Sequence, residues 1–412
     1  MGRYDRRVEP MTTAGPLAGL RVLELSSVLA GPYCAMVLAD LGADVIKVEP
    51  LDGDATRGYG PPWINPEAPL GERTAVYFLS VNRNKRSLRL NIASGEGREV
   101  VRRLIGRSDV LVENLRPGGL ERLGFGRSDL EQINPKLVQL SITGYGPEGP
   151  DAGKPGYDFV AQAVGGLMSV TGFPDASGGQ PTKLGVAITD IVTGLLGTVG
   201  VLAALRSGVG QRIDVSLLES TLAMLINQAH NAFATGEQPP RLGNAHPNIV
   251  PYETFVTADG EIAVAVGSER QWPKLCAELD LPELADDERF ADNGARVRHR
   301  DVLRPILAER FREADSTHWL ARLDEAGIPC GPVNSVLGAF EQPQAVARGM
   351  RVEVDHPSLG SVPQIGLPYK LSVTPASIRS APPLLGEHSV QILAELGYSA
   401  EEVAALSASG VI

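Results

Sequence analysis

The chain has 412 residues, with 38 Lys and Arg against 49 Asp and Glu, and a formal net charge of −11 at pH 7. This acidic balance argues against a nucleic-acid-binding protein that relies on general neutralisation of phosphates. Hydrophobic residues make up 43% and charged residues 21%, an ordinary globular composition that excludes a disordered chain. Three scattered cysteines, Cys34, Cys276 and Cys330, are too few for a disulfide framework, which fits a reducing, cytoplasmic location.

The N-terminal segment is charged and rich in Pro and Gly, whereas a secretory signal needs an apolar core there. The most apolar run, 191–205 (IVTGLLGTVGVLAAL), is shorter than the roughly 20 residues of a membrane span and contains three glycines. We therefore expect a buried helix at this position and no membrane association.

The first part of the chain alternates apolar strand patterns with helical ones. Strands are predicted at 21–25 and 44–49, with a Gly-Pro turn and a helix at 33–42 between them. A second alternation has a strand at 86–92, a helix at 94–106 opened by a Ser cap, and a strand at 109–114. With a further strand in 136–146, the pattern predicts a doubly wound, Rossmann-like α/β domain.

The remaining chain is more mixed. Residues 153–185 are dense in Gly and Pro and predict loops around one short helix. The later pattern predicts helices near 190–206 and 216–236, a hairpin in 252–267, strands within 350–357 and 362–373, and a final helix near 388–406. The segment from about 249 to 330 reads as a smaller α+β domain.

Two strand-to-helix turns are candidate binding sites. The first, 27–32 (SVLAGP), lies where nucleotide phosphates often bind in α/β folds, but it lacks the GxGxxG pattern of dinucleotide sites. The second follows Asn114 and carries Arg116 and Arg122 around a Pro-Gly-Gly bend. Arginine binds phosphate well, although solvated arginines in an ordinary turn are an equally good interpretation.

Asp190 precedes the apolar helix in KLGVAITDIVTGLL. Aspartate is a preferred helix cap, but a helix start also keeps a carboxylate ionised, as a carboxylate nucleophile in acyl transfer requires. Position alone leaves both roles open. The six histidines show no metal-ligand spacing and no GxSxG is present, so neither a metal site nor a serine triad is predicted.

Several segments in chain order resemble the class III acyl-CoA transferases, the family of formyl-CoA transferase and carnitine CoA-transferase. They include PLAGLRVLELSSVLAGPYCAMVLADLGADVIKVE, GDATRG, NRNKRSLRLN, VENLRPGGLERLGF, GYDFVAQAVGG, TGFPDASGGQPTKLGVAITD, GQRIDVSLLES, AGIPCGPVNS and PPLLGEH. Together they cover most of the chain and are far more specific than any one motif.

The resemblance implies a CoA-transferase whose nucleophile is Asp190, in PTKLGVAITD. Its carboxylate would form first an anhydride with the donor acyl group and then a thioester with CoA, before the acceptor acid takes over the CoA. The substrates would be an acyl-CoA and a free carboxylic acid, with no metal and no cofactor beyond coenzyme A. The CoA contacts carried over by the resemblance are Val28, Leu29, Ala30, Leu90, Asn114, Leu115, Arg122, Leu123, Tyr157 and Asp158.

Departures from formyl-CoA transferase indicate a different substrate. That enzyme has a glutamine in place of Leu29, an arginine in place of Pro50 and a run of four glycines that is missing here. The segment RLGNAHPNIVPYETF looks instead like the branch that acts on succinyl-CoA and short dicarboxylic acids. Arg241 or His246 would suit the second carboxylate, although a satisfied turn histidine is the simpler interpretation.

Two other functions remain as alternatives. The family includes a 2-methylacyl-CoA racemase branch, which has a histidine where this chain has Tyr157. Tyrosine, with a pKa of about 10, is a poor base at neutral pH. A non-catalytic CoA-ester-binding protein would follow if Asp190 were only a cap.

The family resemblance also implies an interlocked homodimer with no stable folded monomer. The expected division is 1–220 for the first part of the large domain, 221–330 for the small domain with its linkers, and 331–412 for a segment that returns to the large domain.

Overall fold

The computed structural model describes residues 15–68 and 73–412. The chain separates into two compact units, each assembled from segments far apart in sequence. Unit 1 runs to Gly165 and adds Gly185–Met224 and Pro343–Ile412, and unit 2 comprises Gly166–Leu184 and Leu225–Gln342. In this grouping 166–184 and 331–342 belong to the second unit, whereas the expected division assigns them to the large domain.

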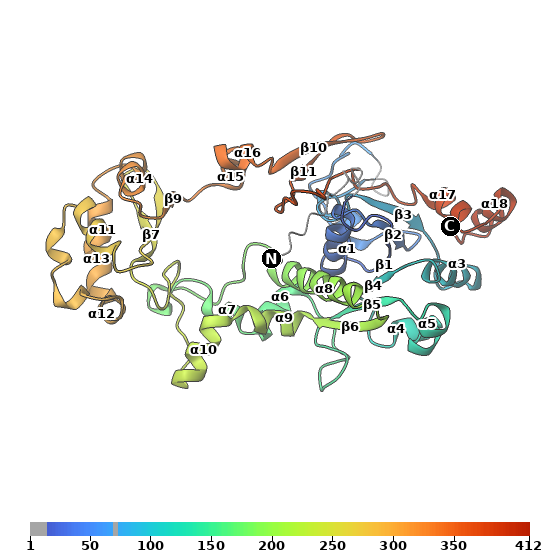
Figure 1. The fold of residues 1–412 in the computed structure, drawn as a ribbon, viewed down its shortest axis with the longest axis horizontal. Helices are drawn as coiled ribbons and strands as arrows, with labels where there is room; N and C mark the ends of the chain where they lie inside the picture. The colour runs from blue at the N-terminus through green and yellow to red at the C-terminus, as the bar shows by residue number, and fades with distance from the viewer. Residues whose placement is uncertain (1–14, 69–72) are drawn as a thin grey trace, which may run out of the picture. The chain divides into compact units, whose positions relative to one another are not determined.

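Unit 1 is built on a parallel sheet with the strand order β3-β2-β1-β4-β5-β6 (Figure 1). Its strands are β1 (Arg21–Leu25), β2 (Asp44–Glu49), β3 (Lys85–Arg89), β4 (Val110–Glu113), β5 (Val138–Thr143) and β6 (Gln211–Ser216). The predicted α/β class is confirmed. The first five strands match the predicted ones, but β6 was not predicted as a strand.

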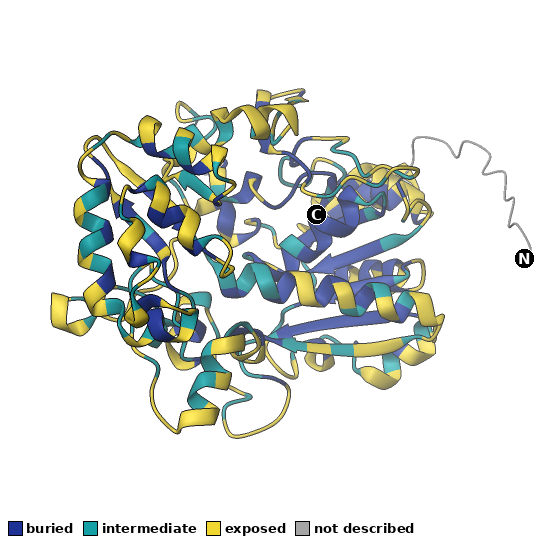
Figure 2. Cartoon of the chain, turned by 60° about the vertical axis from the view of Figure 1, so that its left-hand side comes forward, coloured by how far each residue is buried: buried dark blue, intermediate teal, exposed yellow. Residues whose placement is uncertain are grey.

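Helices cover both faces of this sheet because successive strand residues point to opposite sides. Val22 packs in a core with α1 (Ala30–Asp40) and α8 (Ile188–Ser207). The next residue, Leu23, packs in a second core with other helices of the unit. Those helices are α3 (Gly95–Ile105), α5 (Arg127–Ile133), α17 (Ser389–Glu395) and α18 (Ala400–Ala408). The central strands are therefore buried between helical layers (Figure 2).

The predicted helix boundaries hold where cap residues are clear. The Ser94 hydroxyl accepts a hydrogen bond from the Gly97 N–H and begins α3, and Gly106 ends it. The predicted helix at 216–236 is instead two helices, and the predicted final helix is also split, into α17 and α18. The remaining elements of unit 1 are α2 (Val76–Leu79), α4 (Gly119–Arg122), α6 (Asp158–Val164), α9 (Leu217–Met224), α16 (Pro343–Ala347), the antiparallel pair β10 (Arg351–His356) and β11 (Gly360–Ile365), and the 3₁₀ helix η1 (Ala55–Gly58).

The expectation of a buried helix at the apolar run 191–205 is only partly right. Helix α8 is longer than that run, and much of its surface is exposed. Only one stripe of the helix is buried, including Thr193, Gly197 and Val201, while Val199 is 63% exposed. Among the described residues, α8 alone is long and apolar enough to cross a membrane, with a mean hydropathy of 1.9. This criterion concerns length and composition only, and core helices of soluble proteins also meet it.

Unit 2 contains a small antiparallel sheet in the order β7-β8-β9. The predicted hairpin is confirmed as β7 and β8, which are joined by a turn at Asp259 and Gly260. Its core packs Trp272, Phe290 and Trp319 among the helices around the sheet. The elements are α7 (Leu167–Val170), η3 (Asp175–Ser177), α10 (Ile226–Thr235), β7 (Tyr252–Val256), β8 (Glu261–Ala265), α11 (Trp272–Glu278), η4 (Pro282–Leu284), η5 (Glu288–Phe290), α12 (Asn293–Arg298), α13 (Arg300–Phe311), α14 (Ser316–Glu325), β9 (Cys330–Pro332) and α15 (Val336–Glu341).

Candidate active site

A pocket of about 280 Å³ lies in unit 1 at the carboxyl ends of β1, β4 and β5. The strand order reverses between β1 and β4, and open α/β sheets bind ligands at such a switch point. The pocket is lined by Ser27, Val28, Leu29, Ala30, Asn114, Leu115, Arg116, Pro117, Ile142, Thr143, Gly144, Ala152, Lys154, Pro155, Gly156, Tyr157, Asp190 and Leu217. It thus brings together both candidate turns and the candidate nucleophile.

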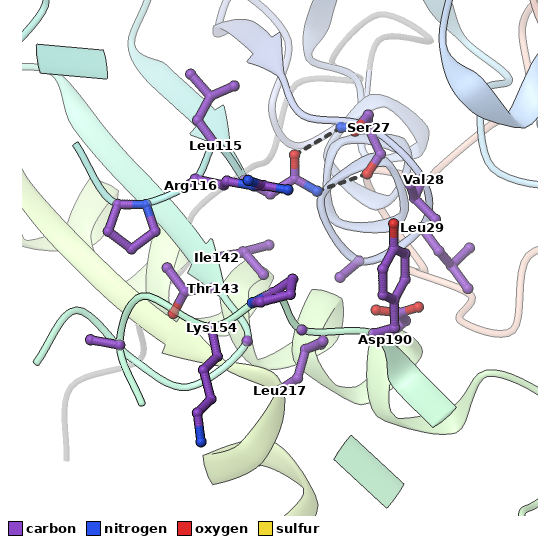
Figure 3. Close-up of a pocket in the computed structure, with 18 residues that line it drawn as sticks. Ser27, Val28, Leu29, Leu115, Arg116, Ile142, Thr143, Lys154, Asp190 and Leu217 are labelled. Atoms are coloured by element: carbon purple, nitrogen blue, oxygen red, sulfur yellow. Dashed lines mark hydrogen bonds between the residues drawn. The ribbon is translucent and has the colours of Figure 1, made fainter. Parts of the chain in front are cut away.

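The turn between β1 and α1 is fixed to the end of β4 by one side chain. The Asn114 amide oxygen accepts a hydrogen bond from the Ser27 N–H at 2.9 Å, and its amide nitrogen donates to the Ser27 carbonyl at 2.8 Å (Figure 3). The next residue, Val28, has a φ of 69°, an unusual conformation for a β-branched residue. Strained backbone of this kind concentrates at functional sites.

Asp190 lies in the first turn of α8 and lines the pocket, but it does not cap the helix. Asp158 takes that role, because its Oδ1 accepts hydrogen bonds from the backbone N–H groups of Thr189 and Asp190 at 2.8 and 3.2 Å. Its other oxygen, Oδ2, accepts a hydrogen bond from Gln162 at 2.7 Å. The cap interpretation of Asp190 is therefore wrong, and its carboxylate is available to the pocket.

The environment of Asp190 changes its acidity. Burial, the larger cause, and the neighbouring charge of Asp158 raise the pKa of Asp190 to about 7. A carboxyl group with this pKa exchanges between its neutral and ionised forms at physiological pH. Raised pKa values of this kind are common among catalytic carboxyl groups.

Aromatic side chains surround the same carboxyl groups. Tyr157 lines the pocket, and Tyr77 meets Tyr59 edge to face with ring centroids 5.6 Å apart. Burial raises the pKa of Tyr77 to about 12, and the charges of Asp190 and Asp158 add to this effect. A phenol of this pKa remains protonated and is a hydrogen-bond donor at neutral pH. Sequence reasoning missed Tyr77, because nothing in the run TAVYFL distinguishes it from a core residue.

Two cations line the pocket away from Asp190. In Figure 3, Arg116 and Lys154 lie to the left of the view, whereas Asp190, Val28 and Leu29 lie to the right. Arg116 is one of the two arginines of the candidate anion-binding turn that follows Asn114. Lys154 was missed, because it lies in a Gly- and Pro-rich loop whose path the sequence does not reveal. Its ammonium group also contacts Asp151 at 2.6 Å.

Six of the ten expected CoA contacts line this pocket, and four do not. Leu90 is fully buried in the core beside α3, and Leu123 packs against the same core. Arg122 and Asp158 also lie outside the lining. Within unit 2, Arg241 pairs with Asp175, and His246 accepts a hydrogen bond from the Asn248 N–H at 3.0 Å. That histidine thus has a satisfied position in a turn.

The described residues contain no group of three or more His, Cys, Asp or Glu side chains arranged to hold a metal ion. Their three cysteines are free thiols.

Comparison with known proteins identifies the family. The profile of CoA-transferase family III matches residues 17–389. The chain is 45% identical over 387 residues to the succinate–glutarate CoA-transferase of Agrobacterium fabrum, with 92% of this chain and 96% of that protein covered. It is 41% identical over 408 residues to the succinyl-CoA:glutarate CoA-transferase of Homo sapiens, with 98% and 91% covered.

A solved structure agrees with this result. The crystal structure of a CAIB/BAIF family protein from Brucella suis matches with a TM-score of 0.81 at 45% identity, covering 93% of this chain and 100% of that one. The similar enzymes favour CoA transfer over racemisation. The chain therefore belongs to CoA-transferase family III and is an enzyme that moves coenzyme A from an acyl-CoA to a carboxylate.

Proposed function

We propose that the enzyme exchanges CoA between succinyl-CoA and a second short dicarboxylic acid, with Asp190 as the covalent nucleophile. The observation that carries the catalytic part is the position of the Asp190 carboxyl group in the pocket at the switch point of the sheet. The substrate class is supported by the two relatives, whose names specify succinate and glutarate.

The reaction begins with attack of the ionised Asp190 carboxylate on the thioester carbonyl of the donor. The carbon–sulfur bond breaks, CoA leaves as the thiolate, and Asp190 holds the acyl group in a mixed anhydride. The thiolate then attacks the aspartyl carbonyl, which releases succinate and leaves CoA on Asp190 as a thioester.

The second half of the reaction reverses these steps with a different acid. The acceptor carboxylate attacks the aspartyl thioester, giving a new anhydride and free thiolate. The thiolate attacks the acceptor acyl carbon, which yields the new acyl-CoA and restores the Asp190 carboxylate. A buried carboxylate with a raised pKa is a stronger nucleophile than an exposed one, because it is more basic and less solvated.

The pocket suits CoA by charge. We propose that Arg116 and Lys154 contact the phosphates of CoA, since both cations line the pocket, while the turn 27–30 and Tyr157 line the part nearer Asp190. We propose that Val28, Leu29, Ala30, Asn114, Leu115 and Tyr157 contact the bound thioester. Contacts from Leu90, Arg122 and Leu123 remain predictions from the resemblance, and Asp158 is better explained as the partner that caps α8.

We further propose an interlocked homodimer located in the cytoplasm. The outer face of α8 supports association, because Leu195, Leu196 and Val199 are 42%, 41% and 63% exposed on one helix. Exposed apolar side chains gathered on a helix face are typical of subunit interfaces.

Mass spectrometry of the enzyme mixed with succinyl-CoA tests the covalent role of Asp190. We expect a CoA-sized adduct on the peptide containing Asp190, and no adduct in Asp190→Ala. A non-cleavable thioether analogue of succinyl-CoA is the control, since it binds without leaving CoA on the protein. A comparable adduct in Asp190→Ala would refute this nucleophile.

A further inference from the structure

Three charged side chains form a buried cluster behind the pocket. Glu24, at the end of β1, is fully buried, and Lys47 and Lys85 are each 1% exposed. The two carboxylate oxygens of Glu24 have different partners: Oε1 lies 3.0 Å from Lys47 Nζ, and Oε2 lies 2.9 Å from Lys85 Nζ. Asp54 adds a second carboxylate to Lys47 at 2.8 Å. The sequence motifs that contain these lysines, DVIKVE and NRNKRSL, have no role in the mechanism above.

Each lysine also holds one end of the pocket turn. Lys47 donates a hydrogen bond to the carbonyl of Ser26 at 2.9 Å, and Lys85 donates to the carbonyl of Pro32 at 2.8 Å. Ser26 immediately precedes the pocket residues 27–30, and Pro32 follows them within the first turn of α1. One carboxylate thus connects, through two cations, to both ends of the segment that lines the pocket.

The charge state of the cluster is consistent with this arrangement. Burial lowers the pKa of Lys85 to about 8, although Glu24 opposes the effect, so this lysine is mainly protonated at neutral pH. Burial also disfavours the charge of Lys47, but Glu24 and Asp54 outweigh it and raise the pKa of that lysine. Both lysines are therefore cations that donate to the turn.

The turn needs such support because its backbone is strained. The left-handed conformation of Val28, with a φ of 69°, is unfavourable for a non-glycine residue, and more so for a β-branched one. Such strain persists only where the surroundings fix the backbone. Asn114 holds Ser27 from the pocket side, and the two lysines hold the flanking carbonyls from the core side.

The same turn is in direct contact with the helix that carries Asp190. Gly194 follows Asp190 by one turn of α8, and a Cβ atom placed on it would lie 2.6 Å from the carbonyl oxygen of Ala30. The backbones of α8 and the turn therefore touch without an intervening side chain. A shift of the turn would change the distance between its pocket face and the Asp190 carboxylate.

We infer that Glu24, Lys47 and Lys85 form a positioning group for the transfer reaction, which fixes the turn 26–32 so that a thioester bound against it faces Asp190. This inference rests on the proposed role of Asp190. It assigns to the cluster an effect on catalysis in addition to the stability expected of buried ion pairs.

Glu24→Gln tests the role, because it keeps the size of the side chain while removing the charge that both lysines share. The matched control is Asp40→Asn, which removes a buried carboxylate paired with Arg83 at 2.7 Å. Asp40 ends α1, ten residues after Ala30 and thus about 15 Å along the helix from the turn. Each variant removes the carboxylate charge paired with a buried cation, Lys85 in Glu24→Gln and Arg83 in Asp40→Asn, so both are expected to lower the melting temperature.

The distinguishing readout is the separation of kcat from KM. For Glu24→Gln we expect kcat to fall about 10-fold or more, with the KM for succinyl-CoA changed less than about 3-fold, because misplaced reacting groups slow the chemical step. Asp40→Asn should keep kcat within about 2-fold of the wild type. Equal loss of kcat in both variants, in proportion to their loss of stability, would show that the cluster only stabilises the fold.

The outcomes separate this inference from the proposed function. A wild-type enzyme that transfers no CoA from any acyl-CoA would contradict the proposed function itself. An active wild type with unchanged kcat in Glu24→Gln would overturn only the positioning role. If Glu24→Gln does not fold, Asp54→Asn takes its place, since it removes one carboxylate from Lys47. We then expect a loss of about 3-fold in kcat, and an unchanged kcat overturns the inference.

Discussion

Asp190 lies at the start of a helix and its carboxyl group is buried, and the sequence alone indicated only the helix start. The backbone donors of the first turn of α8 are taken by Asp158, so they do not stabilise the charge of Asp190. Burial and the charge of Asp158 then dominate and raise its pKa to about 7. The same two aspartates therefore have separate roles, one structural and one open to chemistry.

This arrangement predicts a pH dependence of activity. Only the ionised Asp190 is a nucleophile, so we expect kcat/KM to rise with pH and to reach half of its plateau near pH 7. Asp158→Asn removes the neighbouring charge and should move the midpoint to lower pH. Initial rates measured between pH 5.5 and 8.5 at constant ionic strength check both statements. A flat profile across this range would contradict them.

The same pKa predicts an effect on stability. The pKa of Asp190 is higher in the folded than in the unfolded chain, so its favourable contribution to stability is full below the unfolded-state pKa of about 4 and is lost as the pH rises to about 7. At pH 8 the wild type holds a buried charge that Asp190→Asn does not. We expect Asp190→Asn to be more stable at pH 8 by at least about 1 kcal/mol, and less so at pH 5. Urea denaturation at the two pH values measures the difference.

Among single residues, the sequence identified those site residues that belong to recognisable motifs. It singled out Asp190 and the turn residues 28–30, which line the pocket. It did not find Lys154 or Tyr77, because their proximity to the site depends on how a loop and a short helix fold back in space. The side chain of Leu90, expected from the resemblance to contact CoA, is buried in the core beside α3, and its contact with CoA stays a prediction.

Among the elements, α8 connects the core to the site. Its small residues allow close packing, and Gly194 lies directly against the backbone of the turn before α1. The two helices pack together along their length in the core of unit 1. The exact spacing of these elements therefore depends on the absence of a side chain at this position.

Gly194→Ala tests this dependence. A Cβ atom would overlap the Ala30 carbonyl oxygen at 2.6 Å, so α8 or the turn must shift. We expect a loss of about 1–3 kcal/mol in unfolding free energy. Gly95→Ala in α3 is the control, because a Cβ there meets no atom within 4 Å and should change stability by less than about 0.5 kcal/mol. Equal effects in both variants, by thermal denaturation, would contradict the packing argument.

Element prediction succeeded where hydrophobic period and caps agreed, as in β1, β2 and α3. It missed β6, because this strand at the sheet edge has only two apolar residues, Ile213 and Val215, among polar ones. The split between α17 and α18 follows Gly397, which has a φ of 91°, and Ser399, which begins α18 with a capping box. These signals were present in the sequence, but the apolar pattern across them was continuous enough to predict one helix.

For the whole molecule, the assignment of chain segments to the two units is harder to predict than the helices and strands themselves. Nothing in the local pattern of 166–184 or 331–342 indicates which core they join, since both segments are loop-rich. The resemblance supplied the return of the C-terminal segment to the large domain. The exposure of one side of α8 also could not be predicted from the local pattern, because a run of apolar residues predicts burial on every side of the helix.

If a second copy of the chain covers the exposed face of α8, as proposed above, dimer formation should depend on protein concentration. We expect sedimentation to give twice the mass of one chain, and the unfolding midpoint to rise with protein concentration. Val199→Glu, on the exposed face of α8, should weaken the dimer and lower its unfolding midpoint. Val390→Glu on α17 is the control, since Val390 is similarly exposed at 65% but is not part of that face. A wild type that stays monomeric at high concentration would refute the dimer.

The return of the C-terminal segment also has a consequence for biosynthesis. Ile392, Leu393, Leu406 and Val411 complete the core that covers one face of the sheet, and the Asn91 N–H donates to the carbonyl of Val411. The ribosome makes these residues after all the strands of the sheet, so the nascent sheet keeps part of this apolar face uncovered until the segment that contains them is synthesised. Chains stalled or cleaved before that point would present this face to chaperones and to one another.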